Sequence, residues 1–182
     1  MRIIAGTFRG KIISAPEGSG TRPTADRARE SLFNILNSML MKEGKQWSDI
    51  TFADVFAGSG AVGIEALSRG ARDVFCIEND PVALTSLKQN TVGLSGIHLL
   101  SQSALDPPPH DPIDILFMDA PYGKGLWQKA LTAFQNTGWI NKKTLIIIET
   151  DQKLNEKLPN GYCLVQKRSQ GRNTFLFTKI EV

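Results

Sequence analysis

The chain has 182 residues with 21 basic and 18 acidic side chains, so its net charge is +3, and 41% of its residues are hydrophobic. This composition argues against a disordered chain and fits one packed domain. The longest apolar runs, such as residues 145–148, are too short to cross a bilayer, and the first residues lack the apolar stretch of a secretory signal. Cys76 and Cys163 both lie in apolar stretches, so we expect buried thiols in a reducing compartment and a soluble, cytoplasmic protein.

The charge is unevenly distributed along the chain. Residues 1–29 hold six basic and two acidic residues, residues 30–150 hold nine and thirteen, and residues 151–182 hold six and three. Basic ends around an acidic centre favour a catalytic core whose flanks meet a polyanion, although ordinary surface charge could give so small an excess. We expect a basic N-terminal extension over residues 1–23 and one main domain over residues 24–182.

The first elements in chain order are short. Residues 1–15 contain two glycines between apolar stretches and predict short strands or a hairpin. A helix is predicted to begin near Thr24 as its N-cap, with Asp26 in the first turn. Strands and helices then alternate, with strands at 51–57, 73–78, 97–100, 113–119 and 144–149 and helices at 60–68, 81–91 and 126–135.

This alternation predicts an α/β fold with a parallel sheet and helices on both faces. Asp80 is the expected N-cap of the helix that starts at Pro81. Residues 162–167 and 174–180 break the alternation and predict an antiparallel hairpin, because only a short polar linker with one glycine joins them.

A glycine-rich loop follows the first strand of the alternating region. Gly58, Gly60 and Gly63 form the pattern G-x-G-x-x-G, and Glu78 ends the next strand, where a carboxylate can accept both hydroxyls of a ribose. The pattern predicts a cofactor with an adenine ribose, NAD or S-adenosylmethionine, although the glycines could serve the turn alone. Asp54 is an acid inside an apolar strand and needs a partner, which an ammonium group of a ligand or the neighbouring backbone would supply.

The strand at 113–119 ends in Asp119, Ala120, Pro121 and Tyr122. Its carboxyl end is expected beside the first strand, in the same crevice as the glycine loop. Pro121 stiffens the turn, so that the Asp119 carboxylate, the Ala120 carbonyl and the Tyr122 ring converge on one small volume. Two acceptors and an aromatic face suit a nucleobase with an exocyclic amine that has been taken out of its stack.

The chain resembles the RsmD-type methyltransferases, which methylate N2 of a guanine in 16S ribosomal RNA. The resemblance covers nearly the whole chain and rests on segments in a shared order: MRIIAGTFRG, TRPTADRARESLFNIL, DVFAGSGAVGIEALSRGA, DAPYGKG and GWI. The block from Arg22 to Asn34 is the most specific to the family. The family has two prolines after the aspartate, whereas this chain has Ala120, which keeps the carbonyl and loses only stiffness.

The resemblance implies a class I, Rossmann-like methyltransferase fold with a seven-stranded, mostly parallel sheet, a C-terminal antiparallel hairpin and a small N-terminal strand or hairpin extension. It also implies S-adenosylmethionine as cofactor, 16S ribosomal RNA or the assembling small subunit as partner, and Asp119 through Tyr122 as the residues that hold the target base. Separately, we expect a monomer. The residues implied for the cofactor pocket are Asp54, Phe56, Gly58, Gly60, Glu78, Asn79, Ser103 and Ala104.

Other residues have weaker assignments. The candidates for RNA phosphates, which could equally be ordinary surface residues, are Arg9, Lys11, Arg22, Arg27 and Arg172. Arg29 and Glu30 could instead brace their helix against the sheet. His98 and His110 show no metal-ligand spacing, so no metal is expected. Trp127 and Trp139 are expected to pack in the core.

Three alternatives remain at this point. A DNA or protein amide methyltransferase could use the same tetrapeptide. An NAD-binding oxidoreductase would explain the glycine loop but not the tetrapeptide or the terminal hairpin. An RNA-binding protein whose catalytic site has decayed would explain Ala120.

Overall fold

The structure is a computed structural model and describes residues 1–15, 23–121, 123, 125–151 and 157–181. The helices in these ranges are α1 (Pro23–Lys42), the short 3-10 helix η1 (Trp47–Asp49), α2 (Ala61–Ser68), α3 (Pro81–Thr91) and α4 (Leu126–Asn136). The strands are β1 (Thr51–Val55), β2 (Asp73–Ile77), β3 (Ile97–Leu100), β4 (Ile115–Met118), β5 (Leu145–Asp151), β6 (Tyr162–Gln170) and β7 (Asn173–Ile180). Among the described residues, no helix is both long and apolar enough to span a membrane.

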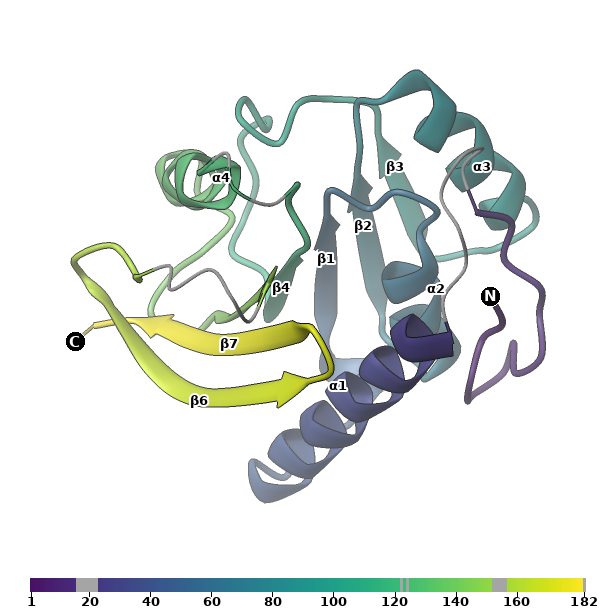
Figure 1. Cartoon of the computed structure of the whole chain (residues 1–182), viewed down its shortest axis with the longest axis horizontal. Helices are drawn as coiled ribbons and strands as arrows, with labels where there is room; N and C mark the ends of the chain where they lie inside the picture. Colours follow the sequence, from purple (N-terminus) through teal and green to yellow (C-terminus); the bar gives the residue numbers. More distant parts are fainter. Residues whose placement is uncertain (16–22, 122, 124, 152–156, 182) are drawn as a thin grey trace.

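The seven strands form one sheet in the order β3-β2-β1-β4-β5-β7-β6 (Figure 1). Strands β1 to β5 are parallel, and β7 joins them antiparallel to β5. The predicted neighbourhood of the first strand and the strand ending at Asp119 is confirmed, because β4 pairs directly with β1. The chain order reverses between β1 and β4, so the carboxyl ends of these two strands flank the crevice in which such sheets bind ligands.

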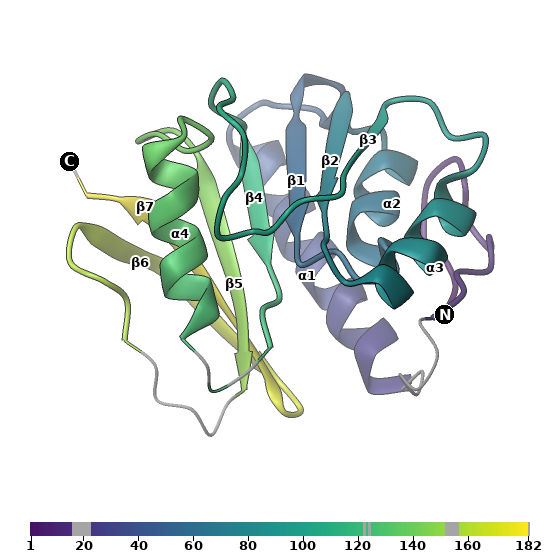
Figure 2. The ribbon, with the colours of Figure 1, turned by 90° about the horizontal axis from the view of Figure 1, so that it is seen from above.

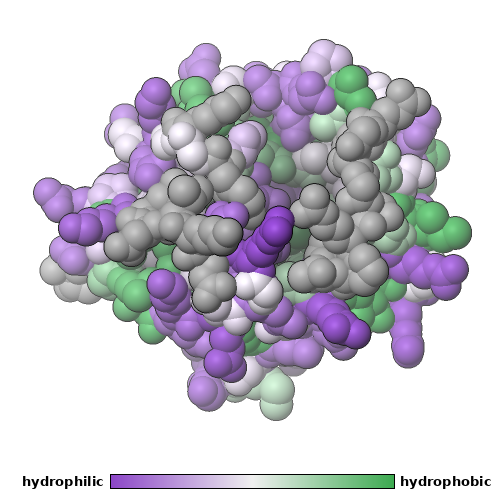
Figure 3. Space-filling model, in the orientation of Figure 1, coloured by the Kyte–Doolittle hydropathy of each residue, from purple (hydrophilic) through white to green (hydrophobic). Residues whose placement is uncertain are grey.

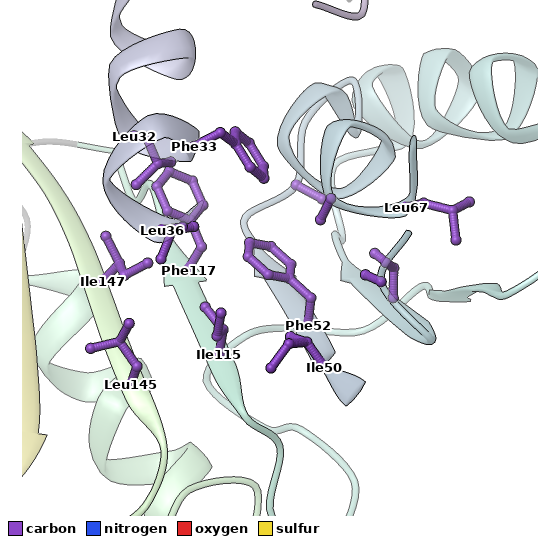
Figure 4. Close-up of a cluster of buried hydrophobic side chains, with 14 of the residues drawn as sticks. Leu32, Phe33, Leu36, Ile50, Phe52, Leu67, Ile115, Phe117, Leu145 and Ile147 are labelled. Carbon is purple, nitrogen blue, oxygen red and sulfur yellow. The ribbon is translucent and has the colours of Figure 1, made fainter. Parts of the chain in front are cut away.

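The core has two layers, one on each face of the sheet. Alternate strand residues point to opposite faces, so Phe52 and Phe117 join a cluster with α1, α2 and α3 (Figure 4). Ala53 and Met118, the next residues along the same strands, join a second cluster with α4, which covers the other face (Figure 2). Each large side chain removed from water in this way contributes about 1.5–3 kcal/mol.

The terminal hairpin of β6 and β7 extends the sheet, and its turn lies at the edge where the parallel strands end. The two strands are longer than predicted, since the turn consists of Gly171 and Arg172 alone. Asn173 pairs with Asp151 at the carboxyl end of β5. Because β7 runs opposite to β5, the β6–β7 turn lies at the same edge of the sheet as the carboxyl ends of the parallel strands.

Residues 1–15 contain one isolated bridge, Arg2 to Ile12, in place of regular strands, and they pack on α2. The buried Glu65 accepts the backbone N–H groups of Ile4 and Ala5 at 2.7 and 3.1 Å. Arg29 of α1 donates to the carbonyl of Arg2 at 2.6 Å. Arg29 thus braces α1 against this N-terminal segment, which is a different partner from the sheet that we expected.

Three local predictions are corrected. The first helix already includes Pro23, so Thr24 lies inside it and is not its N-cap. Cys76 is buried as expected, but Cys163 is exposed, because it lies on β6 at the edge of the sheet. Glu30 is exposed and does not brace the helix. By contrast, Asp80 caps α3 as predicted and accepts the N–H of Ala83 at 2.8 Å.

Candidate functional site

Three carboxylates converge at the carboxyl edge of the sheet. Asp54 belongs to β1, Asp119 follows β4 and Glu149 belongs to β5, and β4 lies between the other two strands. The charge of Asp119 raises the pKa of both Asp54 and Glu149, so the three groups lie close enough to repel one another. They form one group, which we call the acidic cluster, and a cation placed among them would be stabilised.

Asp54 is 2% exposed and has a backbone partner. It accepts the N–H of Gly63 in α2 at 2.8 Å, so the partner visible in the structure is backbone, which was one of the two possibilities for this acid. Burial raises the pKa of the Asp54 carboxyl to about 8, with the Gly63 hydrogen bond opposing the shift and the charges of Asp119 and Glu78 adding to it. The carboxyl is therefore poised to lose a proton if a cationic group binds beside it.

Asp119 differs from Asp54 because solvent reaches it. Desolvation by the surrounding protein raises the pKa of its carboxyl to about 6, whereas at Asp54 the charges of Asp119 and Glu78 add to the effect of burial. Ala120 is buried and Pro121 is exposed, while Tyr122 lies outside the described residues. The structure therefore places the acid and the first half of the turn at the predicted edge.

Glu149 was missed from the sequence. Burial raises the pKa of its carboxyl well above the usual range, with Asp119 and Asp54 adding to the shift. Its carboxylate accepts a hydrogen bond from the side-chain amide of Asn173 in β7. A signal was present, since an acid at the end of the apolar run at residues 145–148 resembles Asp54 in its strand, but only the sheet order shows that the two meet.

The glycine loop is held in an unusual backbone conformation. Phe56, between β1 and the first glycine, has φ 64°, a left-handed conformation that costs a residue with a side chain about 1–3 kcal/mol. Gly60 has φ 75°, and a Cβ there would lie 2.4 Å from Cδ1 of Leu87. At Gly63 a Cβ would lie 2.8 Å from Sγ of Cys76, so this glycine serves close packing of α2 on the sheet.

Glu78 ties the glycine loop to the end of β2. One carboxylate oxygen accepts the N–H of Gly58 at 2.8 Å, and the other accepts those of Asn79 and Asp80 at 2.7 and 2.8 Å. The side chain is 9% exposed. A carboxylate has about four acceptor positions, so three backbone donors leave room for a ligand hydroxyl.

The other residues predicted for the cofactor pocket surround this loop. Ala104 is buried in the second core cluster, which also contains Ile77, and the side chain of Ser103 accepts the N–H of Leu105 at 3.2 Å. Asn79 is exposed and contacts Glu78 through its backbone. Ser103 and Ala104 follow β3 and Asn79 follows β2, so the structure brings them to the same edge as the glycine loop.

Asn90 of α3 connects the glycine loop to the N-terminal segment. Its side-chain amide donates to the carbonyls of Ser59 and Ser14, both at 2.9 Å, and its oxygen accepts the N–H of Ser14 at 3.0 Å. The side chain is 4% exposed. No sequence signal indicates this role, because an asparagine in the last turn of a predicted helix has no distinctive pattern.

The basic candidates for RNA contact that the structure describes lie in three places. Arg27 on α1 and Arg172 in the β6–β7 turn are exposed, and Arg172 lies at the carboxyl edge. Arg9 is exposed and Lys11 half-buried in the N-terminal segment, while Arg22 lies outside the described residues. Across the described ranges no group of three His, Cys, Asp or Glu side chains is arranged to hold a metal ion.

Comparison with known proteins identifies the family. The model of the family described as conserved hypothetical protein 95 matches residues 1–179. The "Ribosomal RNA small subunit methyltransferase D" of Escherichia coli K12 is 35% identical over 83% of this chain and 75% of its own length. The Haemophilus influenzae protein of the same name is 32% identical over 94% of this chain and 89% of its own.

Solved structures agree with these relatives. The Escherichia coli protein yhhF matches with a TM-score of 0.82 and 30% identity, over 100% of this chain and 98% of its own. The predicted class I, Rossmann-like methyltransferase fold is therefore confirmed, and so is the resemblance to the RsmD-type family.

Proposed function

The chain belongs to the conserved hypothetical protein 95 family, and we propose that it transfers a methyl group from S-adenosylmethionine to the exocyclic N2 of a guanine in 16S ribosomal RNA. One observation carries the proposal: the glycine loop, Glu78 and Asp119 with its turn lie at one edge of the sheet, on either side of the β1–β4 switch point. A cofactor site and an acceptor site for a base amine would then be adjacent. The cytoplasmic location and the monomeric state remain predictions.

The residues present fit S-adenosylmethionine. This cofactor carries a sulfonium and an ammonium, and Asp54 and Glu149 of the acidic cluster have raised pKa values that a bound cation would lower. Glu78 would accept a ribose hydroxyl with its free acceptor position while still holding Gly58. The strained backbone at Phe56 supports a ligand-binding role for the loop, because such conformations cluster at functional sites.

In the proposed mechanism the chain positions the amine of the target base. S-adenosylmethionine, when bound, supplies an electrophilic methyl group. The Asp119 carboxylate and the Ala120 carbonyl accept the two N–H groups of the amine and direct its lone pair, which is otherwise delocalised into the ring. They also stabilise the positive charge that develops on nitrogen, and Asp119 can then take the released proton. Tyr122 is proposed to stack on the base.

The basic residues are proposed to bind RNA phosphates. Arg172 and Arg27 support this role best, because both are exposed and Arg172 lies at the edge that holds Asp119. Arg9, Lys11 and Arg22 remain candidates on the N-terminal extension. The names of the curated relatives favour ribosomal RNA over DNA, protein amides or a nicotinamide substrate.

The direct test uses tritiated S-adenosylmethionine. The protein is incubated with small ribosomal subunits and with protein-free 16S RNA, both from cells that lack the gene, and the RNA is digested to nucleosides. We expect label in N2-methylguanosine, and the better substrate would show the stage of assembly at which the enzyme acts. Absence of label, with cofactor still bound, would rule out the ribosomal substrate and leave DNA, protein amides or a decayed site.

The raised pKa of Asp119 predicts how activity depends on pH. Above about pH 6 the carboxyl is ionised and can accept the N–H of the base, and below it the proton occupies that position. We therefore expect kcat at saturating cofactor to fall as pH is lowered through about 6, roughly tenfold per unit once the carboxyl is mostly protonated. Single-turnover rates measured from about one pH unit below this pKa to about two units above it check the prediction, and a flat profile across that range contradicts it.

Asn90 is predicted to position the cofactor loop. Asn90→Ala removes its bond to the Ser59 carbonyl, so we expect the affinity for S-adenosylhomocysteine to fall about 3–10-fold, with about 1–3 kcal/mol lost from the free energy of unfolding. Calorimetric titration and thermal unfolding measure the two effects.

The matched control for this prediction is Ser68→Ala. It removes bonds between α2 and the N-terminal segment, to Phe8 and Ala5, without touching the glycine loop. We expect Ser68→Ala to lose stability and keep its cofactor affinity. Equal loss of affinity in both variants would show that Asn90 acts only through general stability.

A further inference from the structure

A polar groove of about 640 Å³ lies between α1 and the edge strand β6. The α1 side carries Arg27, Glu30, Asn34 and Lys42 among its lining residues. Figure 3 shows that hydrophilic side chains predominate over this part of the molecule. Nothing proposed above for the cofactor or the base uses this groove.

The sheet order explains why the groove is open and polar. Phe175 and Phe177 of β7 face α1 in the core, and their partners directly across on β6 are Arg168 and Gln166. Directly opposed residues point to the same face, so these two side chains face the α1 side of the sheet. Since α1 packs over the inner strands, this outer strip remains uncovered.

The groove leads to the acidic cluster. Gln170, which lines one end, pairs with Asn173, and the side chain of Asn173 donates to Glu149. Glu149 in turn interacts with Asp119. Fifteen residues along α1 separate Arg27 from Lys42, which is about 22 Å at 1.5 Å per residue.

We propose that this groove holds the phosphate backbone of the RNA substrate and leads it to Asp119. This inference rests on the proposed function and extends it by naming the surface that holds the RNA. Arg27, Lys42 and Arg168 are exposed cations that can pair with phosphates. The neutral side chains of Gln166 and Gln170 can bond to phosphate or to the ribose 2′-hydroxyl.

The charge of the groove favours a polyanion as its occupant. Three cations face the single acid Glu30 among the lining residues. An apolar partner surface of a protein would leave the two glutamines and Asn34 without hydrogen-bond partners, whereas a nucleic-acid backbone offers acceptors to all three.

The test measures binding of a 16S ribosomal RNA fragment, without cofactor, to the full chain and to Arg27→Gln and Arg168→Gln variants. We expect each variant to raise the Kd about 3–10-fold at low salt. The slope of log K against log salt should become shallower by about 0.7–0.9 for each phosphate that the variant no longer neutralises. The affinity for S-adenosylhomocysteine should stay unchanged.

The matched control is Lys142→Gln together with Lys143→Gln. These lysines are exposed and precede β5, at the opposite edge of the sheet, and the pair removes the same charge as the two arginine substitutions combined. Glu30→Gln tests the direction of the electrostatic effect. Removal of this acid from the groove should strengthen RNA binding about 2–3-fold, a gain that loss of structure would not give. Thermal unfolding of each variant excludes misfolding.

Each outcome of this test either supports or overturns the proposal. RNA binding that is weakened no more by the groove variants than by the lysine pair overturns the proposal. Equal loss of binding to polyglutamate and to RNA would assign the groove to any polyanion and would also overturn it. If the wild-type protein transfers no methyl group but the groove variants still weaken RNA binding, the groove assignment stands and the proposed reaction is wrong.

Discussion

Asp119→Ala is expected to lower the rate of methyl transfer at least about tenfold while the affinity for S-adenosylhomocysteine changes by no more than a few-fold. The reason is that Asp119 follows β4 at the edge, whereas the glycine loop and Glu78 are held by bonds in which it takes no part. Removal of an interaction made with the reacting amine in the transition state lowers kcat and kcat/KM together. Single-turnover rates with saturating RNA, alongside calorimetric cofactor titrations, measure the two quantities.

Asp111→Ala is the matched control for this prediction. Asp111 is an exposed acid in the loop before β4, at the opposite end of the same strand, so its removal changes the net charge equally. We expect this variant to transfer methyl groups at the wild-type rate. Unchanged turnover in Asp119→Ala would remove Asp119 from the mechanism, and an equal loss in both variants would reduce its role to net charge.

Glu78→Gln is expected to have the opposite pattern, with cofactor affinity reduced about 10–100-fold. The carboxylate accepts N–H groups on both of its oxygens, from Gly58 on one side and from Asn79 and Asp80 on the other. The amide of glutamine can accept hydrogen bonds only through its oxygen. Its NH2 group would take the place of the second carboxylate oxygen and would point N–H donors at backbone N–H groups, which are donors themselves. A buried donor left without its acceptor costs about 1–3 kcal/mol, so the glycine loop should lose its position as well as a ribose contact.

Calorimetric titration with S-adenosylhomocysteine and thermal unfolding measure this effect. Glu181→Gln, an exposed acid next to the carboxyl-terminal end of β7, makes the same chemical change away from the site and should bind cofactor as the wild type does. If Glu78→Gln binds the cofactor with wild-type affinity, Glu78 neither holds the ribose nor fixes the loop.

Local pattern was enough for most of the regular elements. The helix at 81–91 and the strand at 97–100 have the bounds that were predicted, since a capping aspartate, a proline at the first helical position and a short apolar run mark their limits. The structure of the first fifteen residues was harder to predict from the sequence. Their backbone groups bond to Glu65 and Ser68 of α2 as well as to each other, so the predicted strands reduce to one bridge.

By itself the sequence determined the alternating α/β fold, the family, the glycine loop and the aspartate before the turn, because each depends on spacing along the chain. The tertiary structure alone decided which distant residues meet. Glu149 joins Asp54 because β5 lies two strands from β1, and Asn90 joins Ser14 to Ser59 because α3 packs beside both. Arg168 faces α1 because of its register with Phe175. Such contacts depend on strand order and register, which local propensity does not encode.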